Sequence, residues 1–518
     1  MKVAFRADAG PRIGTGHVMR LLTLANALVA DAPDTSCVFL CRQLPDALER
    51  RLLSDGHEVV RLGTPEAPPP APGQGQYGGW LGTTEAHDAT ATLDALATLP
   101  EGADRVVVDH YGLGSEWERI VRAGTDVPLW ALDDLTRLHS CSGLIDTTYG
   151  READDYSAHV PEDAVVLAGA RFALLRPDFA ELRDAALARR DGRAPFRDLL
   201  VSMGGMDADN ATARVLDAVA AYADTGARDF GVHVMLGASA PHLEDVKSRA
   251  GKLLRDAGLS VTVHAGVEDV ASLLARMDGC VGAPGSSTWE RACLGLPTVN
   301  VTIADNQQTI ARNLAEAGAV RDGGTLEAFD AEAFAEHHLR PLVEDVSLRR
   351  TLSLNSREIV DGRGAGRVAR ELALRLVPAT REHIETMFAW QTDPVTRAQS
   401  RNPEPPRWET HLAWSERRLR APYGRFYIVV VAGEPSGVVR LEPRGSGPDW
   451  EISVLVAPGA HGRGIGTAAI RRILARHPRD TVHAFVKSTN PASQRAFEKS
   501  GFARVDAENF VRSARSAS

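Results

Sequence analysis

The sequence of 518 residues has few cysteines and lacks any long hydrophobic run. Its five cysteines are scattered and form no C-x-x-C pair, which argues against a disulfide framework or a zinc site and for reduced thiols. No stretch approaches ~18 uninterrupted apolar residues, so we expect no transmembrane helix. The N-terminus enters a strand directly and lacks the layout of a secretion signal. These absences predict a cytoplasmic protein with no membrane partner.

An excess of positive charge is also missing. The chain has 59 Lys and Arg against 68 Asp and Glu, a formal net charge of −9, so we expect no general nucleic-acid partner. Hydrophobic residues make up 44% and charged residues 25%, which is typical of a globular protein. A chain of this length exceeds one ordinary core, and two to four domains are expected.

Strand-like and helix-like segments alternate through the first two thirds of the chain. Short buried strands are expected at residues 3–7, 37–41, 105–109 and 128–132, and a second block repeats the alternation. This pattern predicts an α/β fold with two doubly wound, Rossmann-type domains, 1–148 and 149–370, and a ligand between them. After about residue 375, neighbouring antiparallel strands predict an α+β domain, 373–518. The Pro- and Gly-rich segment 64–79 is expected to be a surface loop, with a lid over the site as one interpretation.

The most informative motif lies near the start of the chain. The sequence G-T-G-H-V-M-R at residues 14–20 joins a short apolar strand to an amphipathic helix. Gly14 and Gly16 permit close ligand approach, and the first N–H groups of the helix favour an anion. An imidazole titrates near neutral pH, which suits proton transfer by His17. A tight turn in which His17 only caps the helix is the other interpretation.

A second strand, glycine loop and helix unit lies at residues 279–291. Its loop, residues 285–288, can hold a pyrophosphate through N–H groups and hydroxyls. Glu290, about one turn into the helix, can accept hydrogen bonds from both ribose hydroxyls. A packing turn in which Glu290 complements the helix dipole is the alternative. Asp207 and Asp209 follow a Gly-Gly turn, so N-capping by one of them is expected rather than metal binding.

These motifs, with D-H-Y at 109–111 and N-Q at 306–307, resemble the nucleotide-sugar hydrolases of pseudaminic acid biosynthesis. The resemblance covers residues 1 to about 345 and implies a GT-B-like pair of domains that releases UDP from UDP-2,4-diacetamido-2,4,6-trideoxy-beta-L-altrose. No D-x-D pair lies in a metal-binding setting, so we expect no divalent metal. The resemblance implies that His17 is the general base and that Tyr111 and Asn306 lie beside the sugar. It further implies that UDP and substrate contact Gly14, Gly16, Arg20, Gly204, Gly205, Gly285, Ser286, Ser287, Thr288, Glu290 and Gln307.

The C-terminal third carries two motifs of another kind. The loop H-G-R-G-I-G-T at 461–467 and the segment at 490–502 resemble the pyrophosphate loop and closing segment of GNAT N-acetyltransferases. The resemblance covers roughly 375 to 510 and implies acetyl-CoA as cosubstrate. His461 replaces the usual Gln or Arg, and Phe497 replaces a tyrosine that often serves as general acid. Glu451 is a candidate base, or else an exposed strand residue. Acetyl-CoA contacts are expected at Val454, Val456, His461, Gly462, Arg463, Gly464, Ile465, Gly466, Thr467 and Asn490.

Together the two modules predict a bifunctional enzyme. The GNAT domain would acetylate the 4-amino group of a UDP-sugar, and the hydrolase domains would then release the free sugar. Three alternatives stay open: a GT-B glycosyltransferase with an accessory GNAT domain, a nucleotide-sugar sensor with degenerate catalysis, and the same chemistry on a legionaminic- or bacillosamine-type nucleotide sugar. The sequence does not indicate the oligomeric state or the acyl donor preference.

Overall fold

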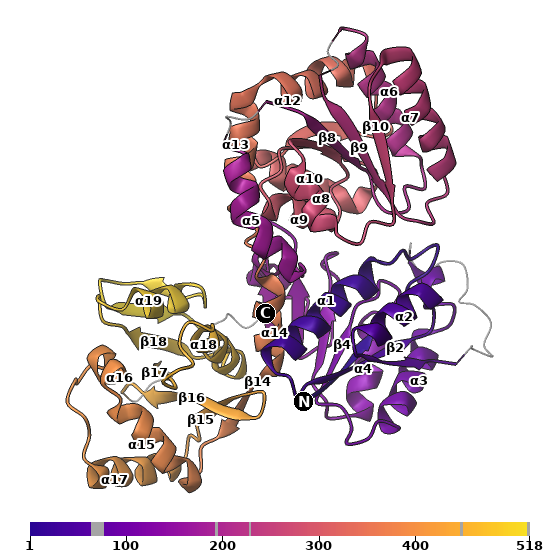
Figure 1. Cartoon of the computed structure of the whole chain (residues 1–518). Coiled ribbons are helices and arrows are strands. Elements are labelled where there is room, and N and C mark those ends of the chain that lie inside the picture. Colours follow the sequence, from indigo (N-terminus) through magenta and orange to yellow (C-terminus); the bar gives the residue numbers. More distant parts are fainter. Residues whose placement is uncertain (64–76, 192–194, 227–228, 446–448, 515–518) are drawn as a thin grey trace.

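The computed structural model describes residues 1–63, 77–191, 195–226, 229–445 and 449–514 (Figure 1). Most of the segment 64–79, for which the sequence suggests a loop or lid, lies outside the described residues. The described residues form three sheets: two parallel sheets come first along the chain, and a mixed sheet follows. Within the described ranges, no helix is both long and apolar enough to cross a membrane.

The first sheet is parallel and has the order β3-β2-β1-β4-β5-β6-β7. Val3 and Phe5 face one core and Ala4 faces the other, so both faces of the sheet are buried, as parallel sheets require. Its strands are β1 (Lys2–Arg6), β2 (Ser36–Cys41), β3 (Glu58–Arg61), β4 (Arg105–Val108), β5 (Leu129–Leu132), β6 (Gly143–Asp146) and β7 (Val165–Ala168). The helices between them are α1 (Gly16–Asp31), α2 (Asp46–Ser54), α3 (Glu85–Ala97) and α4 (Ser115–Gly124).

The first sheet reaches further along the chain than the sequence suggested. The expected boundary lay at residue 148, but β7 pairs with β6 in parallel and extends this sheet to residue 168. The connection between β6 and β7 contains a short 3-10 turn, Ala153–Tyr156, and no long helix. A helix-and-strand alternation therefore does not mark this last strand.

The second sheet is also parallel, with the order β10-β9-β8-β11-β12-β13. Its strands are β8 (Asp198–Ser202), β9 (Gly231–Leu236), β10 (Val261–Ala265), β11 (Gly279–Gly282), β12 (Thr298–Thr302) and β13 (Arg321–Thr325). Its helices are α5 (Pro177–Arg189), α6 (Ala211–Ala223), α7 (Leu243–Ala257), α8 (Val270–Arg276), α9 (Ser287–Cys293), α10 (Gln308–Glu316), α11 (Ala331–Phe334), α12 (Arg340–Glu344) and α13 (Val346–Ser356). The strand order confirms the predicted GT-B-like pair of Rossmann-type domains.

Helix α14 (Gly364–Ala373) returns to the first sheet and packs against α1. Its apolar residues Ala365, Val368, Ala369 and Leu372 belong to the same buried core as β1. Strand β14 (Leu374–Pro378) starts directly after Ala373, so no linker separates the first domain from the third sheet. In Figure 1, α14 lies between these two parts of the molecule.

The third sheet is mixed and has the order β14-β15-β16-β17-β18-β20-β19. Strands β14 to β17 are antiparallel neighbours, and β17 then pairs with β18 in parallel. The remaining strands are β15 (Phe426–Val431), β16 (Glu434–Pro443), β17 (Asp449–Val456), β18 (Thr481–Phe485), β19 (Ala503–Arg504) and β20 (Asn509–Arg512). The helices are α15 (Ile384–Thr392), α16 (Pro394–Gln399), α17 (Trp408–Leu419), α18 (Ile465–Arg476) and α19 (Pro491–Glu498). This is the predicted α+β domain.

Candidate functional site

The predicted site loops follow the strands at which each parallel sheet reverses its order. In the first sheet β1 and β4 are neighbours, and their C-terminal ends lead to the loops with His17 and Tyr111. In the second sheet β8 and β11 are neighbours, and they lead to Gly205 and Gly285. Ligands of open α/β sheets bind at such reversal points. The four loops therefore lie at the C-terminal ends of the central strands, where a ligand is expected.

His17 lies in the first turn of α1 and is buried, with 7% of its surface exposed. Its Nδ1 is 2.6 Å from Oδ1 of Asp109, the first residue after β4. Arg20, one turn further along α1, donates hydrogen bonds to both oxygens of the same carboxylate. Asp109 is fully buried beneath these two side chains.

The ionisation of Asp109 fixes the tautomer of His17. Burial alone would raise the pKa of Asp109, but the charge of Arg20 and the contact with His17 outweigh it and hold this pKa well below its ordinary value. An ionised carboxylate only accepts hydrogen bonds, so Nδ1 of His17 carries the hydrogen. Nε2 of a neutral His17 is then the atom free to accept a proton.

Aromatic side chains surround His17. The ring of Tyr111 contacts the imidazole edge-on at a centroid distance of 4.8 Å, and Trp80 lies 6.1 Å from it. Tyr77 packs against both Tyr111 and Trp80. The Tyr111 hydroxyl donates to Asp134 at 2.6 Å. Burial, and then the charge of Asp134, raise the pKa of Tyr111 well above its ordinary value, so its hydroxyl stays protonated.

The sequence pattern does not single out four members of this cluster. These are Asp109, Asp134, Tyr77 and Trp80, although D-H-Y at 109–111 follows a strand. That position was the available signal for Asp109, because residues after the central strands of a parallel sheet line its ligand edge. Tyr77 and Trp80 adjoin a Pro- and Gly-rich segment that has no periodicity to read.

In the second domain, the glycine positions leave open space. A Cβ placed on Gly204 or Gly205 would contact nothing within 4 Å, and one on Gly285 would meet only Nε2 of Gln307, at 3.9 Å. Gly204 has a φ of +116°, which favours glycine. Asp207 accepts hydrogen bonds from the N–H groups at the start of α6, which is the predicted capping role.

Two hydroxyls of the second glycine loop, those of Ser287 and Thr288, accept hydrogen bonds from within the domain. Arg291 donates to Oγ of Ser287 and to Oγ1 of Thr288, at 3.0 Å each, and Thr288 is buried. These side chains therefore brace the loop from inside, and its more exposed residues are Gly285 and Ser286. Each hydroxyl keeps its O–H to donate, and contact of Ser287 and Thr288 with a ligand stays a prediction.

Glu290 has a carboxylate available for a ligand. It is partly buried, and no described residue forms a hydrogen bond or ion pair with its side chain. Burial raises the pKa of Glu290 from 4.5 to about 7, against the opposing charges of Arg176 and Arg291. Asn306 is exposed in the turn after β12, and Gln307 accepts a hydrogen bond from the N–H of Ile303. Within the described ranges, no hydrogen bond joins Asn306 to His17 or Tyr111.

In the third domain, β17 and β18 separate along their length. They pair only between residues 449–452 and 481–484, whereas β17 continues to Val456 with β16 as its partner. The backbone around Val454 and Val456 is therefore unpaired on the β18 side. Such a strand edge can hydrogen-bond an extended, amide-containing ligand.

The loop after β17 is exposed and ends at the start of α18. Gly462 and Gly464 have φ values of +77° and +81°, and His461 and Arg463 are exposed. Gly464 is the N-cap of α18, and no side chain caps this helix. Ile465 is buried in the core, so only its N–H group is available to a ligand. Gly466 and Thr467 follow in the first turn of the helix.

Three further predicted residues of this domain have structural partners. Glu451 forms an ion pair with Arg401 at 2.9 Å. The Asn490 side chain caps α19 by accepting a hydrogen bond from the N–H of Ser493 at 3.0 Å. Phe497 is buried and packs against Phe502 at a centroid distance of 5.0 Å, so its ring belongs to the core and not to the strand edge.

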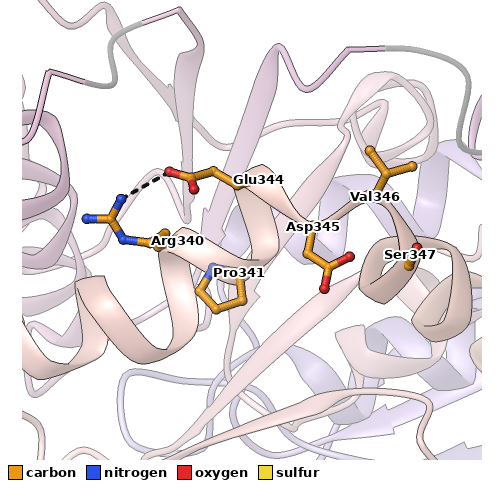
Figure 2. Close-up of a pocket in the computed structure, with 6 residues that line it drawn as sticks. All are labelled: Arg340, Pro341, Glu344, Asp345, Val346 and Ser347. Carbon is orange, nitrogen blue, oxygen red and sulfur yellow. Dashed lines mark hydrogen bonds and ion pairs between the residues drawn. The ribbon is translucent and has the colours of Figure 1, made fainter.

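A separate cleft of about 570 Å³ lies where α12 meets α13 (Figure 2). Arg340 pairs with Glu344 across one turn there, at 3.2 Å, and Asp345 caps α13. The lining residues lie on these two helices, away from the strand ends that carry the predicted site residues: Arg340, Pro341, Glu344, Asp345, Val346 and Ser347.

Comparison with known families identifies the third domain. Residues 373–503 match the sequence model of the family described as "Acetyltransferase (GNAT) domain". The splayed strands and the glycine loop lie within this match. The chain therefore carries a GNAT acetyltransferase domain, as its motifs indicate.

The N-terminal part is similar to proteins of polysaccharide and sugar-nucleotide metabolism. One is the "Spore coat polysaccharide biosynthesis protein SpsG" of Bacillus subtilis, 24% identical over 51% of this chain and 75% of that protein. Another is the "UDP-2,4-diacetamido-2,4,6-trideoxy-beta-L-altropyranose hydrolase" of Campylobacter jejuni, 25% identical over 42% of this chain and 64% of that protein. The match thus spans slightly less than two thirds of the hydrolase.

A longer alignment and two solved structures complete the comparisons. An uncharacterized protein of Methanocaldococcus jannaschii is 19% identical over 80% of this chain and 78% of its own length. MurG of Acinetobacter baumannii (TM-score 0.49, 14% identity) covers 71% of this chain and 98% of its own. Medicago truncatula UGT71G1 complexed with UDP-glucose (TM-score 0.48, 15% identity) covers 72% and 98%. The chain thus joins a GNAT domain to a two-domain region that is similar to a sugar-nucleotide hydrolase.

Proposed function

We propose that this chain is a bifunctional enzyme of pseudaminic acid biosynthesis. Its first two domains hydrolyse UDP-2,4-diacetamido-2,4,6-trideoxy-beta-L-altrose to UDP and the free sugar. Its third domain transfers an acetyl group from acetyl-CoA to the 4-amino group of the UDP-sugar precursor. The observation that carries the hydrolase proposal is the buried pair of His17 and Asp109 at the reversal point of the first sheet.

In the hydrolysis, His17 acts on a water molecule at the anomeric carbon. Nε2 takes a proton from this water. The water oxygen forms a bond to the anomeric carbon, and the bond from that carbon to the UDP oxygen breaks. Asp109 stabilises the imidazolium that forms, while Arg20 keeps the carboxylate ionised and in place. The backbone at Gly285 and Ser286 and the N-terminus of α9 face the charge of the leaving diphosphate. Tyr111 and Asn306 would orient the sugar.

The acetyl transfer uses the splayed strands of the third domain. Acetyl-CoA would supply the acetyl group: the sugar amine would form an amide bond to the acetyl carbonyl carbon, the bond from that carbon to the CoA sulfur would break, and CoA would leave as its thiol. The free edge of β17 would bind the pantetheine amides, and the backbone from Gly462 to Thr467 would bind the pyrophosphate. Glu451 lies on the same strand and would accept the proton of the amine, with Arg401 as the ion-pair partner that must give way.

The test follows both reactions by proton NMR. Purified protein is given the UDP-4-amino-sugar with and without acetyl-CoA, and N-acetylation and free reducing sugar are recorded over time. We expect acetylation followed by sugar release, and loss of the release alone in His17→Asn. His87→Asn, which changes an exposed histidine of the first domain, is the matched control. UDP release retained in His17→Asn would exclude His17 as the base.

The same experiment separates the other interpretations. Release of UDP only after an acceptor is added would indicate a glycosyltransferase with an accessory acetyltransferase domain. Binding of both ligands without turnover would indicate a sensor. Turnover of a legionaminic- or bacillosamine-type nucleotide sugar in preference to the altrose compound would keep the chemistry and change the substrate.

A further inference from the structure

The GNAT domain is held against the first domain by several polar contacts. Arg471 of α18 pairs with Glu371 of α14 at 2.7 Å, and Arg472 donates to the Glu371 carbonyl. Arg479, which follows α18, pairs with Glu162 of the first domain at 2.8 Å. Because α18 starts at the predicted CoA loop, this packing brings that loop to the surface of the first domain.

Two residues of the CoA loop approach the first domain directly. Arg463 pairs with Asp31, the last residue of α1, at 3.4 Å. A Cβ placed on Gly464 would lie 3.6 Å from Nε of Arg370 in α14. Arg370 precedes the start of the family match at residue 373, so it belongs to the helix of the first domain and lies next to the N-cap of α18.

Arg370 places a positive charge next to the CoA loop. Its guanidinium is partly buried, and no described residue accepts a hydrogen bond from it or forms an ion pair with it. Burial, followed by repulsion from Arg367 and Arg463, lowers the pKa of Arg370, while Asp31 opposes this shift. Arg367 is already paired with Asp361. An unpaired guanidinium in partly buried surroundings is a favourable place for a phosphate.

We propose that the acetyl-CoA site is composite, with Arg370 of the first domain and Arg463 of the GNAT loop binding the CoA pyrophosphate from two sides. The inference rests on the proposed use of acetyl-CoA and adds a binding residue from outside the GNAT domain. Arg463 exchanges Asp31 for the phosphate when CoA binds. Asp31 therefore competes with the ligand, and its removal favours CoA.

The test is calorimetric titration of the full chain with CoA, 3′-dephospho-CoA and pantetheine, which lacks all phosphates. Arg370→Ala is expected to weaken CoA and 3′-dephospho-CoA about tenfold or more and to leave pantetheine unchanged, because a charge-assisted hydrogen bond to phosphate is lost. Asp31→Asn is expected to tighten CoA about two- to fivefold. Arg363→Ala, which removes an exposed charge at the start of the same helix, is the matched control and keeps the wild-type affinity.

Each other result overturns the inference. Unchanged CoA affinity in Arg370→Ala, with binding by the wild type, excludes Arg370 from the site and leaves the acetyl-CoA proposal intact. If Arg370→Ala weakens pantetheine binding as much as CoA binding, Arg370 has a structural role and does not bind phosphate. If Arg370→Ala loses affinity for CoA but not for 3′-dephospho-CoA, Arg370 contacts the 3′-phosphate and not the pyrophosphate. A wild type that binds neither CoA compound contradicts the proposed function as well.

Discussion

The carboxylate of Asp109 lies 2.6 Å from Nδ1 of His17 and accepts hydrogen bonds from Arg20 as well. One buried anion thereby fixes both the orientation and the tautomer of the imidazole. His17 and Asp109 are 92 positions apart in the sequence, and they meet because β1 and β4 are neighbours in the sheet.

Asp109→Asn is expected to reduce UDP release by at least about 100-fold. An amide carries no charge to stabilise the imidazolium, and its NH2 group would face either His17 or Arg20, so the contribution of general-base catalysis is lost. A coupled assay for UDP measures the rate. Asp126→Asn changes an exposed carboxylate of the same domain and should leave it unchanged. Release within about twofold of the wild type in Asp109→Asn would contradict the assigned role.

Glu290 should make the stability of the protein depend on pH. Its pKa is raised from 4.5 to about 7 by burial, so the folded state holds this proton more tightly than the unfolded state does. The stabilisation is present below pH ~4.5 and is lost as pH rises through ~7. Glu290→Gln, which cannot ionise, should therefore raise Tm relative to the wild type by more at pH 8 than at pH 5.

Thermal unfolding at the two pH values measures this difference. Glu316→Gln, an exposed carboxylate in α10, serves as the control and should shift Tm equally at both. A Glu290→Gln shift that is the same at pH 5 and pH 8 would show that Glu290 has an ordinary pKa.

Two glycines of α14 should respond in opposite directions to alanine. A Cβ on Gly364 would lie 2.2 Å from the carbonyl oxygen of Ala173, whereas one on Gly366 would meet only the flexible side chain of Arg370, at 3.6 Å. Gly364→Ala is expected to cost about 1–3 kcal/mol or more through overpacking. Gly366→Ala is expected to stabilise the helix by up to about 1 kcal/mol. Calorimetric unfolding of both variants checks the pair, and equal effects would contradict the close contact of α14 with the first domain.

Phe497→Tyr should not create a better acetyltransferase. The ring packs against Phe502 and lies 6.3 Å from Phe510 in the core, so an added hydroxyl would be buried without a described partner at a cost of about 1–3 kcal/mol. We expect a lower Tm and no gain in the acetyl-transfer rate. A faster rate with an unchanged Tm would show that this position faces the CoA sulfur.

The sequence predicts the units of the fold well because each one is local. A buried run, a glycine loop and an amphipathic helix mark the units that contain His17, Gly205 and Glu290, and each appears as a strand, loop and helix in the structure. The glycine loop of the GNAT domain can be predicted for the same reason, because its motif consists of residues that are neighbours in the sequence.

Contacts between segments that are distant in the sequence cannot be predicted in this way. The carboxylate of Asp134 meets Tyr111 only because both follow adjacent strands, and Trp80 reaches His17 from another loop. The sequence also does not show that Thr288 accepts a hydrogen bond from the buried Arg291 on the same helix. Composition does not show which side of a loop a hydroxyl faces.

The direct passage from α14 into β14 also governs how the molecule moves in solution. Because α14 is part of the core of the first domain and β14 is the edge strand of the GNAT sheet, the acetyltransferase domain has no hinge of free residues about which to swing. A probe fixed to it would therefore tumble together with the first domain. If the two proposed reactions follow one another, the distance between their sites is therefore set by the fold, and not by the length of a flexible linker.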